Sequence, residues 1–235
     1  MELKDGYLVV AKGSIGPLND LTFLLDTGSS RTLIDPHIAK DLHLEGPNHT
    51  LTVFDHEVES KLVVLPDLQL GAIRARALSV IVMDLSGISH KIGIPTDAVL
   101  GVDMLRLRTF SIDYNSKQIW FGDSGPMRSS VHVEAGLPYM IMEARINNFP
   151  VRLIVDTGCD DVALYANRVP KGLNETSFRE SQALTLVGKA RTQIGFGNLA
   201  VATSPTRKVK MRIISTGGND LGFDGVIGVR PLRAS

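Results

Sequence analysis

The chain has 235 residues, 43% of them hydrophobic, which is enough to bury one or two sizeable cores. Its 25 Lys and Arg balance 25 Asp and Glu, and this zero formal charge argues against nucleic acid or an anionic membrane as a partner. A single cysteine excludes an intramolecular disulfide, and no apolar stretch approaches the roughly 18 residues that a membrane-spanning helix needs.

Short β-rich segments separated by turn residues fill the first half of the chain. Asp35 and Pro36 predict the start of a short helix that runs through Leu42, because Asp caps free amides and Pro fits the first turn. The remaining predictions are hairpins at residues 7–25, 51–65 and 110–121, a strand at 32–34, strands with a turn at 71–72 within 68–82, and a helical turn at 104–108.

The second half repeats this pattern after a segment rich in Gly, Ser and Pro. A hairpin is expected at residues 140–155 with its turn at Asn147 and Asn148, and another at residues 184–192. Long periodic helices are absent, so the fold class is mainly β. The domain boundaries follow from the linker: residues 1–122 form the first unit, 123–130 the linker and 131–235 the second unit.

One motif occurs in both units, and it carries the chemistry. An apolar run ends in Asp-Thr-Gly at residues 26–28 and again at residues 156–158. Each copy is followed by an Asp-x-Val-x-Gly-Val run, at residues 97–102 with Gly101 and at residues 224–229 with Gly228. A lone Asp-Thr-Gly is more often a structural turn. The matched pairs indicate a duplicated domain in which Asp26 and Asp156 are the only carboxylates in equivalent settings.

These motifs resemble the aspartic protease superfamily, and the resemblance covers most of the chain. The run from Asp156 to Asp161 is similar to the retroviral Asp-Thr-Gly-Ala-Asp-Asp, and the run from Asp26 to Ser30 looks more like pepsin. The resemblance implies two similar retropepsin-like β-barrel lobes with a few short helices, related by a pseudo-twofold axis, with one catalytic aspartate from each. Two carboxylates so close would share a proton and activate water for peptide hydrolysis.

The neighbours of the aspartates have expected roles. Gly28 and Gly158 let the backbone turn sharply beside the carboxylates, and Thr27 and Thr157 resemble the threonines that hydrogen-bond across the lobes. The Ser29 hydroxyl is expected to donate to Asp26, and Cys159 is a weaker donor at the matching place, so Asp26 is expected to ionise more readily.

Other residues near the motifs are open to two interpretations. Asp160 and Asp161 match substrate-binding or arginine-pairing positions, with Arg230 as a candidate partner, and are equally compatible with solvated turns. Phe54 could cover a peptide from the first flap, although a flap tyrosine or Gly-rich tip is lacking. Cys159 fits a small packing residue better than a nucleophile.

Three other patterns mimic functional motifs. Residues 122–126 resemble a serine-protease nucleophile loop but lack a Gly and lie in the linker. Gly195 and Gly197 mimic a dinucleotide fingerprint, yet Pro205 breaks the helix that should follow. His37, His43, His49 and His56 lack helical zinc spacing and are expected on the surface. No metal or cofactor is predicted.

The functional hypotheses are therefore an aspartic endopeptidase, a catalytically silent peptide-binding or interaction module of the same fold, and a processing protease specific for one partner. Peptide or protein substrates and a monomer are expected. The second unit ends at Ser235, seven residues past Gly228, without the hairpin that follows Gly101. The first residues lack a signal peptide's apolar core. Localisation is left open between the cytoplasm and, if a signal or anchor was removed, the periplasm or exterior.

Overall fold

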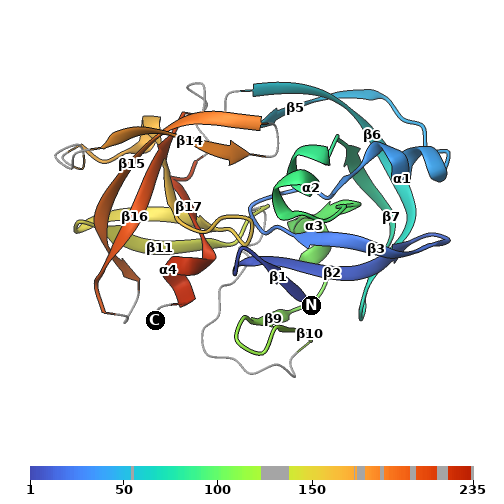
Figure 1. Cartoon of the computed structure of the whole chain (residues 1–235), viewed down its shortest axis with the longest axis horizontal. Helices are drawn as coiled ribbons and strands as arrows, with labels where there is room; N and C mark the ends of the chain where they lie inside the picture. The colour runs from blue at the N-terminus through green and yellow to red at the C-terminus, as the bar shows by residue number, and fades with distance from the viewer. Residues whose placement is uncertain are drawn as a thin grey trace.

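The computed structural model is mainly β, with two sheets that form two lobes (Figure 1). It describes residues 1–53, 56–122, 138–171, 173, 178–185, 188–201, 205–215 and 222–233. Phe54, the linker at residues 123–130, most of the Gly122–Pro126 run and the start of the second unit, which were singled out in the sequence, lie outside the described residues. No helix within the described ranges has the length and apolarity to cross a bilayer.

The first lobe is built on an eight-stranded sheet in the order β1-β2-β3-β8-β4-β7-β6-β5. An additional pairing of β2 with β6 closes the ring β2-β3-β8-β4-β7-β6, which leaves β1 and β5 outside it. The strands are β1 (Glu2–Lys4), β2 (Leu8–Ile15), β3 (Leu18–Leu25), β4 (Leu33–Ile34), β5 (Asn48–Val53), β6 (His56–Leu70), β7 (Ile73–Val82) and β8 (Ala98–Leu100).

Within the described residues, the second lobe repeats this topology for every strand except β1. Its seven-stranded sheet has the order β11-β12-β17-β13-β16-β15-β14, and the additional β11–β15 pairing matches β2–β6. The two lobes are therefore similar, as the sequence repeat predicts. The strands are β11 (Ile141–Ile146), β12 (Phe149–Val155), β13 (Val162–Tyr165), β14 (Arg179–Thr185), β15 (Gly188–Val201), β16 (Arg207–Ile214) and β17 (Gly225–Ile227).

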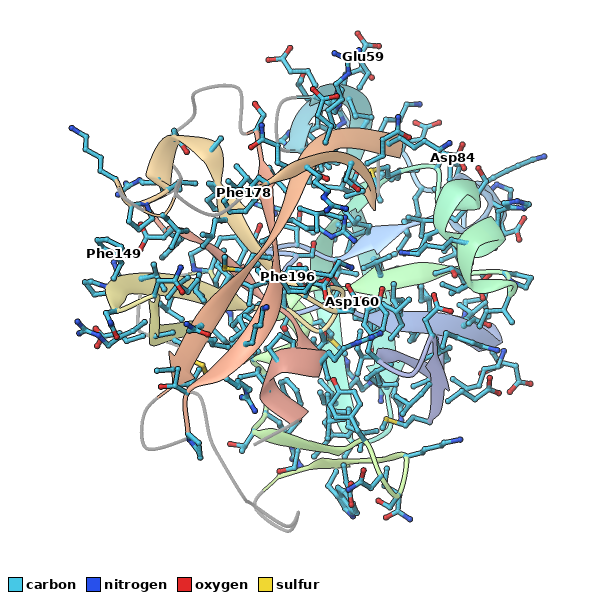
Figure 2. The ribbon with its side chains drawn as sticks, turned by 60° about the vertical axis from the view of Figure 1, so that its left-hand side comes forward. Glu59, Asp84, Phe149, Asp160, Phe178 and Phe196 are labelled. Carbon is cyan, nitrogen blue, oxygen red and sulfur yellow. The ribbon has the colours of Figure 1, made fainter. Side chains whose placement is uncertain are left out.

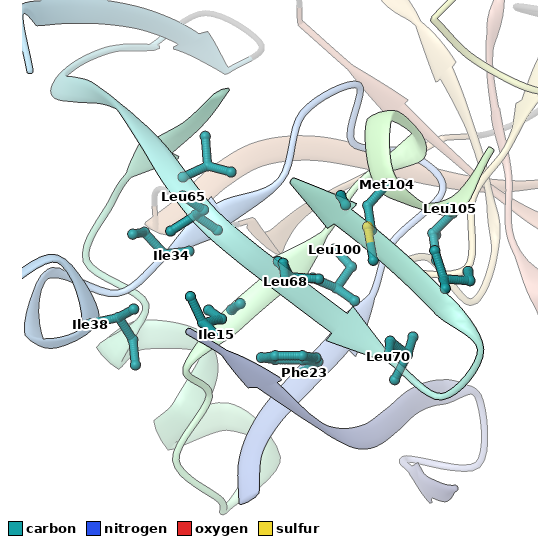
Figure 3. Packing of buried hydrophobic residues seen from close by; sticks show 14 of the residues in the cluster. Ile15, Phe23, Ile34, Ile38, Leu65, Leu68, Leu70, Leu100, Met104 and Leu105 are labelled. Atoms are coloured by element: carbon teal, nitrogen blue, oxygen red, sulfur yellow. The ribbon is translucent and has the colours of Figure 1, made fainter. Parts of the chain in front are cut away.

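Each closed ring holds its own apolar core. In the first lobe Phe23 lies fully buried among Ile15, Leu68 and Leu100, which come from different strands (Figure 3). Alternating side chains of β6 are buried and exposed over much of its length, which is the two-residue period of a strand with one face on the core. Burial of these side chains, at about 25 cal/mol per Å² of apolar surface, is the main stabilising contribution.

A hairpin of β9 (Phe110–Asp113) and β10 (Gln118–Phe121) packs on the first core through Phe110, Ile112, Ile119 and Phe121. The Met1 ammonium group donates to the Lys117 carbonyl oxygen at its turn, 3.5 Å away. The second lobe has no counterpart of this hairpin among its described residues.

The helices are short, and two were not predicted. The helix at residues 36–42 is confirmed as α1 (Pro36–Asp41): the Asp35 carboxylate accepts the His37 amide at 3.2 Å, and Leu42 is the C-cap. The helical turn at 104–108 begins earlier, as α3 (Val102–Leu105). The missed helices are α2 (Ser86–Ile92), where Asp84 accepts the Ser86 amide and Gly93 ends the helix at a φ of 72°, and α4 (Val229–Arg233).

Gly101 and Gly228 allow the chain to cross itself closely. A Cβ atom on Gly101 would lie 2.6 Å from the Arg31 carbonyl carbon, and one on Gly228 would lie 2.5 Å from the Cys159 carbonyl oxygen. The next residues continue the match, since the amides of Val102 and Val229 donate to the carbonyl oxygens of Ser29 and Cys159. Both glycines thus fix the loop that follows each Asp-Thr-Gly.

We predict that Gly101→Ala lowers the free energy of unfolding by about 1–3 kcal/mol, because the methyl group would overlap backbone atoms that cannot rotate away. The matched control is Gly87→Ala in α2, where a Cβ atom meets nothing within 4 Å and alanine favours the helix. Urea denaturation of both variants checks this. Equal stability of the two would contradict the close-crossing role of Gly101.

Candidate active site

Asp26 and Asp156 follow the ends of equivalent strands. Asp26 comes after β3 and its amide donates to the Leu100 carbonyl oxygen at 3.0 Å, and Asp156 comes after β12 and its amide donates to the Ile227 carbonyl oxygen at 3.0 Å. Each carboxylate then accepts the amide two residues on, from Gly28 at 2.9 Å and from Gly158 at 2.7 Å. The two loops are therefore built alike.

Thr27 and Thr157 join the two loops by four crossed hydrogen bonds. The amide of Thr27 donates to Thr157 Oγ1 at 3.0 Å, and the amide of Thr157 donates to Thr27 Oγ1 at 3.0 Å. Each hydroxyl then donates to the opposite lobe, to the carbonyl oxygens of Val155 at 2.6 Å and Leu25 at 2.8 Å. This is the cross-lobe arrangement that the resemblance implies.

The glycines bring the carboxylates together. A Cβ atom on Gly28 would lie 2.6 Å from both Asp156 oxygens, and one on Gly158 would lie 2.9 Å from Asp26 Oδ1. Only glycine leaves room for this approach. Asp26 is buried, with 8% of its surface exposed, and it shares a hydrogen bond with the Asp156 side chain.

Burial raises the pKa of both carboxyl groups. For Asp156 the pKa lies well above the ordinary 3.8, because burial, the negative charge of Asp26 and the hydrogen bond to Asp26 all favour its protonated form. For Asp26 the hydrogen bond from Asp156 and the amides of Gly28 and Ser29 counteract burial and lower the pKa. These causes favour protonation of Asp156 over protonation of Asp26, which is the order expected from the sequence.

The reason expected for that order is wrong. The Ser29 hydroxyl donates to the Arg31 carbonyl oxygen at 2.7 Å rather than to Asp26. The Cys159 thiol makes the matching bond to the Asp161 carbonyl oxygen at 3.4 Å. Burial and the nearby Asp156 raise the pKa of the Cys159 thiol well above its ordinary value, and the side chain packs against an apolar cluster of the second lobe. These contacts fit a packing residue.

Asp160 and Asp161 pair with different cations. The Asp160 carboxylate lies 3.5 Å from Arg230 Nη2, as the sequence suggested. The Asp161 side chain is 7% exposed and its Oδ2 lies 2.8 Å from Lys210 Nζ and 3.5 Å from Arg212 Nε. Sequence inspection missed these last two cations, because only the strand pairing brings β16 beside the loop.

Three further residues support the loops and were also missed. Asp97 and Asp224 belong to the repeated glycine motif, and their carboxylates accept the amides of Thr22 at 2.5 Å and Arg152 at 2.7 Å in the two lobes. The matching positions of these two aspartates in the repeated motif could have identified them from the sequence. Tyr7, from the first lobe, is buried near Asp160 and Asp156, and burial together with those charges raises its pKa.

The histidines that the structure describes do not form a metal cluster. His37 is half exposed, with its ring nitrogens 2.7 Å from Asp35 Oδ1 and 3.0 Å from Asp97 Oδ1. Across the described residues, no group of His, Cys, Asp and Glu could hold a metal ion. A surface cavity beside α2 is lined by His37, His90 and neighbours, and the two motif aspartates do not line it. Gly195 and Gly197 lie within strand β15.

Comparison with known proteins agrees with this geometry. Residues 11–104, which include Asp26 and Gly101, match the family model described as aspartyl protease. This match lies within the first lobe and supports the aspartyl protease superfamily. A solved structure described as a retropepsin-like aspartic protease from Rickettsia conorii is 18% identical over 45% of this chain and 76% of its own, with a TM-score of 0.34. No curated protein of similar sequence was found.

We predict that Thr27→Val lowers the free energy of unfolding by about 2–4 kcal/mol, because the buried Thr157 amide and Val155 carbonyl both lose their partner. Thr27→Ser keeps the hydroxyl and is expected to lose less than about 1 kcal/mol. Chemical denaturation separates the two variants. A larger loss for Thr27→Ser than for Thr27→Val would mean that the methyl packing, and not the hydrogen bonds, carries the stabilisation.

The raised pKa values predict that this site destabilises the fold as pH rises. Above the ordinary pKa of 3.8 the unfolded aspartates release protons that the folded pair retains, so stability falls by up to about 1.4 kcal/mol per pH unit for each retained proton. The free energy of unfolding of Asp156→Asn, measured by urea denaturation, should therefore exceed that of wild type by an amount that grows from pH 4 to pH 7. For the exposed control Asp20→Asn the difference in unfolding free energy from wild type should be the same across this pH range.

Proposed function

We propose that the chain is an aspartic endopeptidase in which Asp26 and Asp156 act as one catalytic pair. The observation that carries the proposal is the crossed threonine bonding that holds the buried Asp26 carboxyl group and the partly buried Asp156 carboxyl group against each other. Two carboxyl groups in such contact cannot both ionise cheaply, so one is a base while the other is an acid at the same pH. The aspartyl protease family match supports the same chemistry.

The proposed mechanism assigns one role to each aspartate. Ionised Asp26 takes a proton from a water molecule, whose oxygen attacks the carbon of the peptide carbonyl, while protonated Asp156 gives its proton to the carbonyl oxygen. The tetrahedral intermediate then collapses as Asp26 gives the proton it took from water to the amide nitrogen and the carbon–nitrogen bond breaks. The hydroxyl proton on the former carbonyl oxygen returns to Asp156, and a carboxylic acid and an amine leave. The rigid loops keep both carboxyl groups in place throughout.

An extended peptide is the substrate form that this architecture suits. The hairpins β5–β6 and β14–β15 hold equivalent places in the two sheets, and Figure 1 shows β5 and β14 along the upper side of the molecule, each reaching toward the other lobe. A peptide between the lobes can add its backbone as a strand beside these hairpins. Because each lobe supplies one aspartate, we propose that a monomer, divided at residues 123–130, is the working unit.

We predict that Asp26→Asn and Asp156→Asn each lower kcat by at least about a thousandfold, because asparagine keeps the shape and can neither accept nor supply the proton. A library of peptides incubated from pH 3 to pH 7 and analysed by mass spectrometry measures this. Asp20→Asn, near the start of β3 at a φ of 56° that asparagine also adopts, is the matched control and should cleave as wild type does.

Two outcomes would contradict the proposal in different ways. Cleavage that survives both substitutions would exclude the pair as the catalytic groups. Wild type that cleaves nothing, yet binds peptides as tightly as both variants do, would support the catalytically silent peptide-binding module instead.

A further inference from the structure

The total formal charge is zero, but the two halves of the chain have net charges of opposite sign. Residues 1–122 contain 11 Lys and Arg against 15 Asp and Glu, whereas residues 138–235 contain 13 against 8. Much of the positive charge of the second half belongs to three neighbouring strands, β14, β15 and β16. A substrate therefore meets different fields on the two sides of the site.

Four of these cations lie on one face of the second sheet. Residues directly opposite each other across a ladder share a face, and the register pairs Ile194 with both Arg179 and Arg212, Phe196 with Lys210, and Asn198 with Lys208. We call Arg179, Lys208, Lys210 and Arg212 the basic face. Phe196 is 52% exposed on the same face, with Lys208 Nζ 5.3 Å from its ring centroid, and Figure 2 labels it in a view with the second lobe forward.

The basic face has more positive charge than its surroundings neutralise. Asp161 is the one carboxylate that pairs with it within the described residues, through Lys210 and Arg212. A single negative charge cannot balance these two cations, and Arg179 and Lys208 add two more. A further carboxylate brought to Lys210 and Arg212 would make charge-assisted hydrogen bonds in a partly buried place, since Arg212 is 19% and Lys210 37% exposed.

A continuous row of residues connects Arg212 to the catalytic strand. Ile154 pairs with Val226, Val226 with Ala163, and Ala163 with Arg212, so all four side chains lie on one face. Neighbouring strands are about 4.8 Å apart, which places Arg212 roughly 14 Å from Ile154. Ile154 precedes Asp156 by two residues. An extended peptide covers that distance in about four residues.

The equivalent row of the first lobe ends differently. Leu24 pairs with Val99, Val99 with Leu33, and Leu33 with Ile81, in the same strands of the repeated topology. Ile81 takes the place of Arg212, is 1% exposed, and packs in a cluster with Leu85 and Ile92 at α2. The first lobe thus covers with an apolar helix the place where the second lobe has a cation.

We infer that Arg212 and Lys210 form a subsite for an acidic side chain of the peptide substrate, about four residues from the scissile bond and on the side of the second lobe only. This inference rests on the proposed function, because the peptide is positioned by the catalytic pair. Asp161 holds the two cations in place, and Phe196 offers an apolar contact to a neighbouring residue of the substrate. The one-sided charge fixes the direction in which the peptide binds.

The test uses peptides with a statine unit in place of the scissile bond, which bind without being cleaved. Glu and Gln are compared at each of the positions two to five on either side of the statine. Wild type should bind the Glu peptide about tenfold more tightly at one or two positions on one side only, and this preference should shrink in high salt. Fluorescence anisotropy gives the dissociation constants.

Variants locate the preference. Arg212→Gln and Lys210→Gln should each reduce the Glu preference to about threefold or less. Two variants are used so that the test still stands if one of them does not fold. Arg191→Gln is the matched control, because it removes the same charge from β15 on the opposite face, and it should keep the full preference.

The outcomes separate this inference from the proposed function. No binding by any peptide, equal binding of Glu and Gln peptides at all positions, or a preference that Arg191→Gln reduces as much as Arg212→Gln would overturn the subsite. Cleavage of neutral peptides without any Glu preference would leave the hydrolase intact and the subsite wrong. A Glu preference in a protein that cleaves nothing would support the subsite as a binding site and remove the hydrolase.

Discussion

The crossed hydrogen bonds of Thr27 and Thr157 are the interaction on which the rest of the structure depends. They hold two aspartates together in a buried place, which is unfavourable for the ionised forms of both. The cores of two closed sheets offset this cost, because each loop is anchored to strands that cannot shift without exposing apolar side chains. A stable scaffold thus keeps an unfavourable arrangement of charge, and that arrangement is what can exchange protons with a substrate.

The two lobes share a topology and differ, among the described residues, in the side chains on the outside of each sheet. Around each motif aspartate the same bonds recur, down to the carboxylates of Asp97 and Asp224 that accept an amide in each lobe. Away from the aspartates the lobes diverge, with α2 packed over one sheet and cations on the other. The shared part supports the chemistry, and the divergent part can distinguish the two ends of a substrate.

The sequence predicted the strands, the paired motifs and the helix at Asp35, because each depends on local signals that occur within a few residues. It did not predict α2, whose starting residues Ser86 and Gly87 are weak helix formers. The donor to Asp26 was misjudged, since the Arg31 carbonyl oxygen competes for the Ser29 hydroxyl only in the folded turn. The pairing of Asp161 with Lys210 and Arg212 depends on strand register across about 50 residues, which a pattern of residue types does not contain.

The partly buried charges at Asp161, Lys210 and Arg212 need a reason other than stability. Removing such groups from water costs free energy that their attraction only partly returns, and apolar residues of similar size often serve as well or better. This chain provides the comparison itself, because Ile81 fills the place of Arg212 in the first lobe and is almost completely buried there. An arginine at the end of the row from the catalytic strand is therefore better explained by what it binds than by what it stabilises.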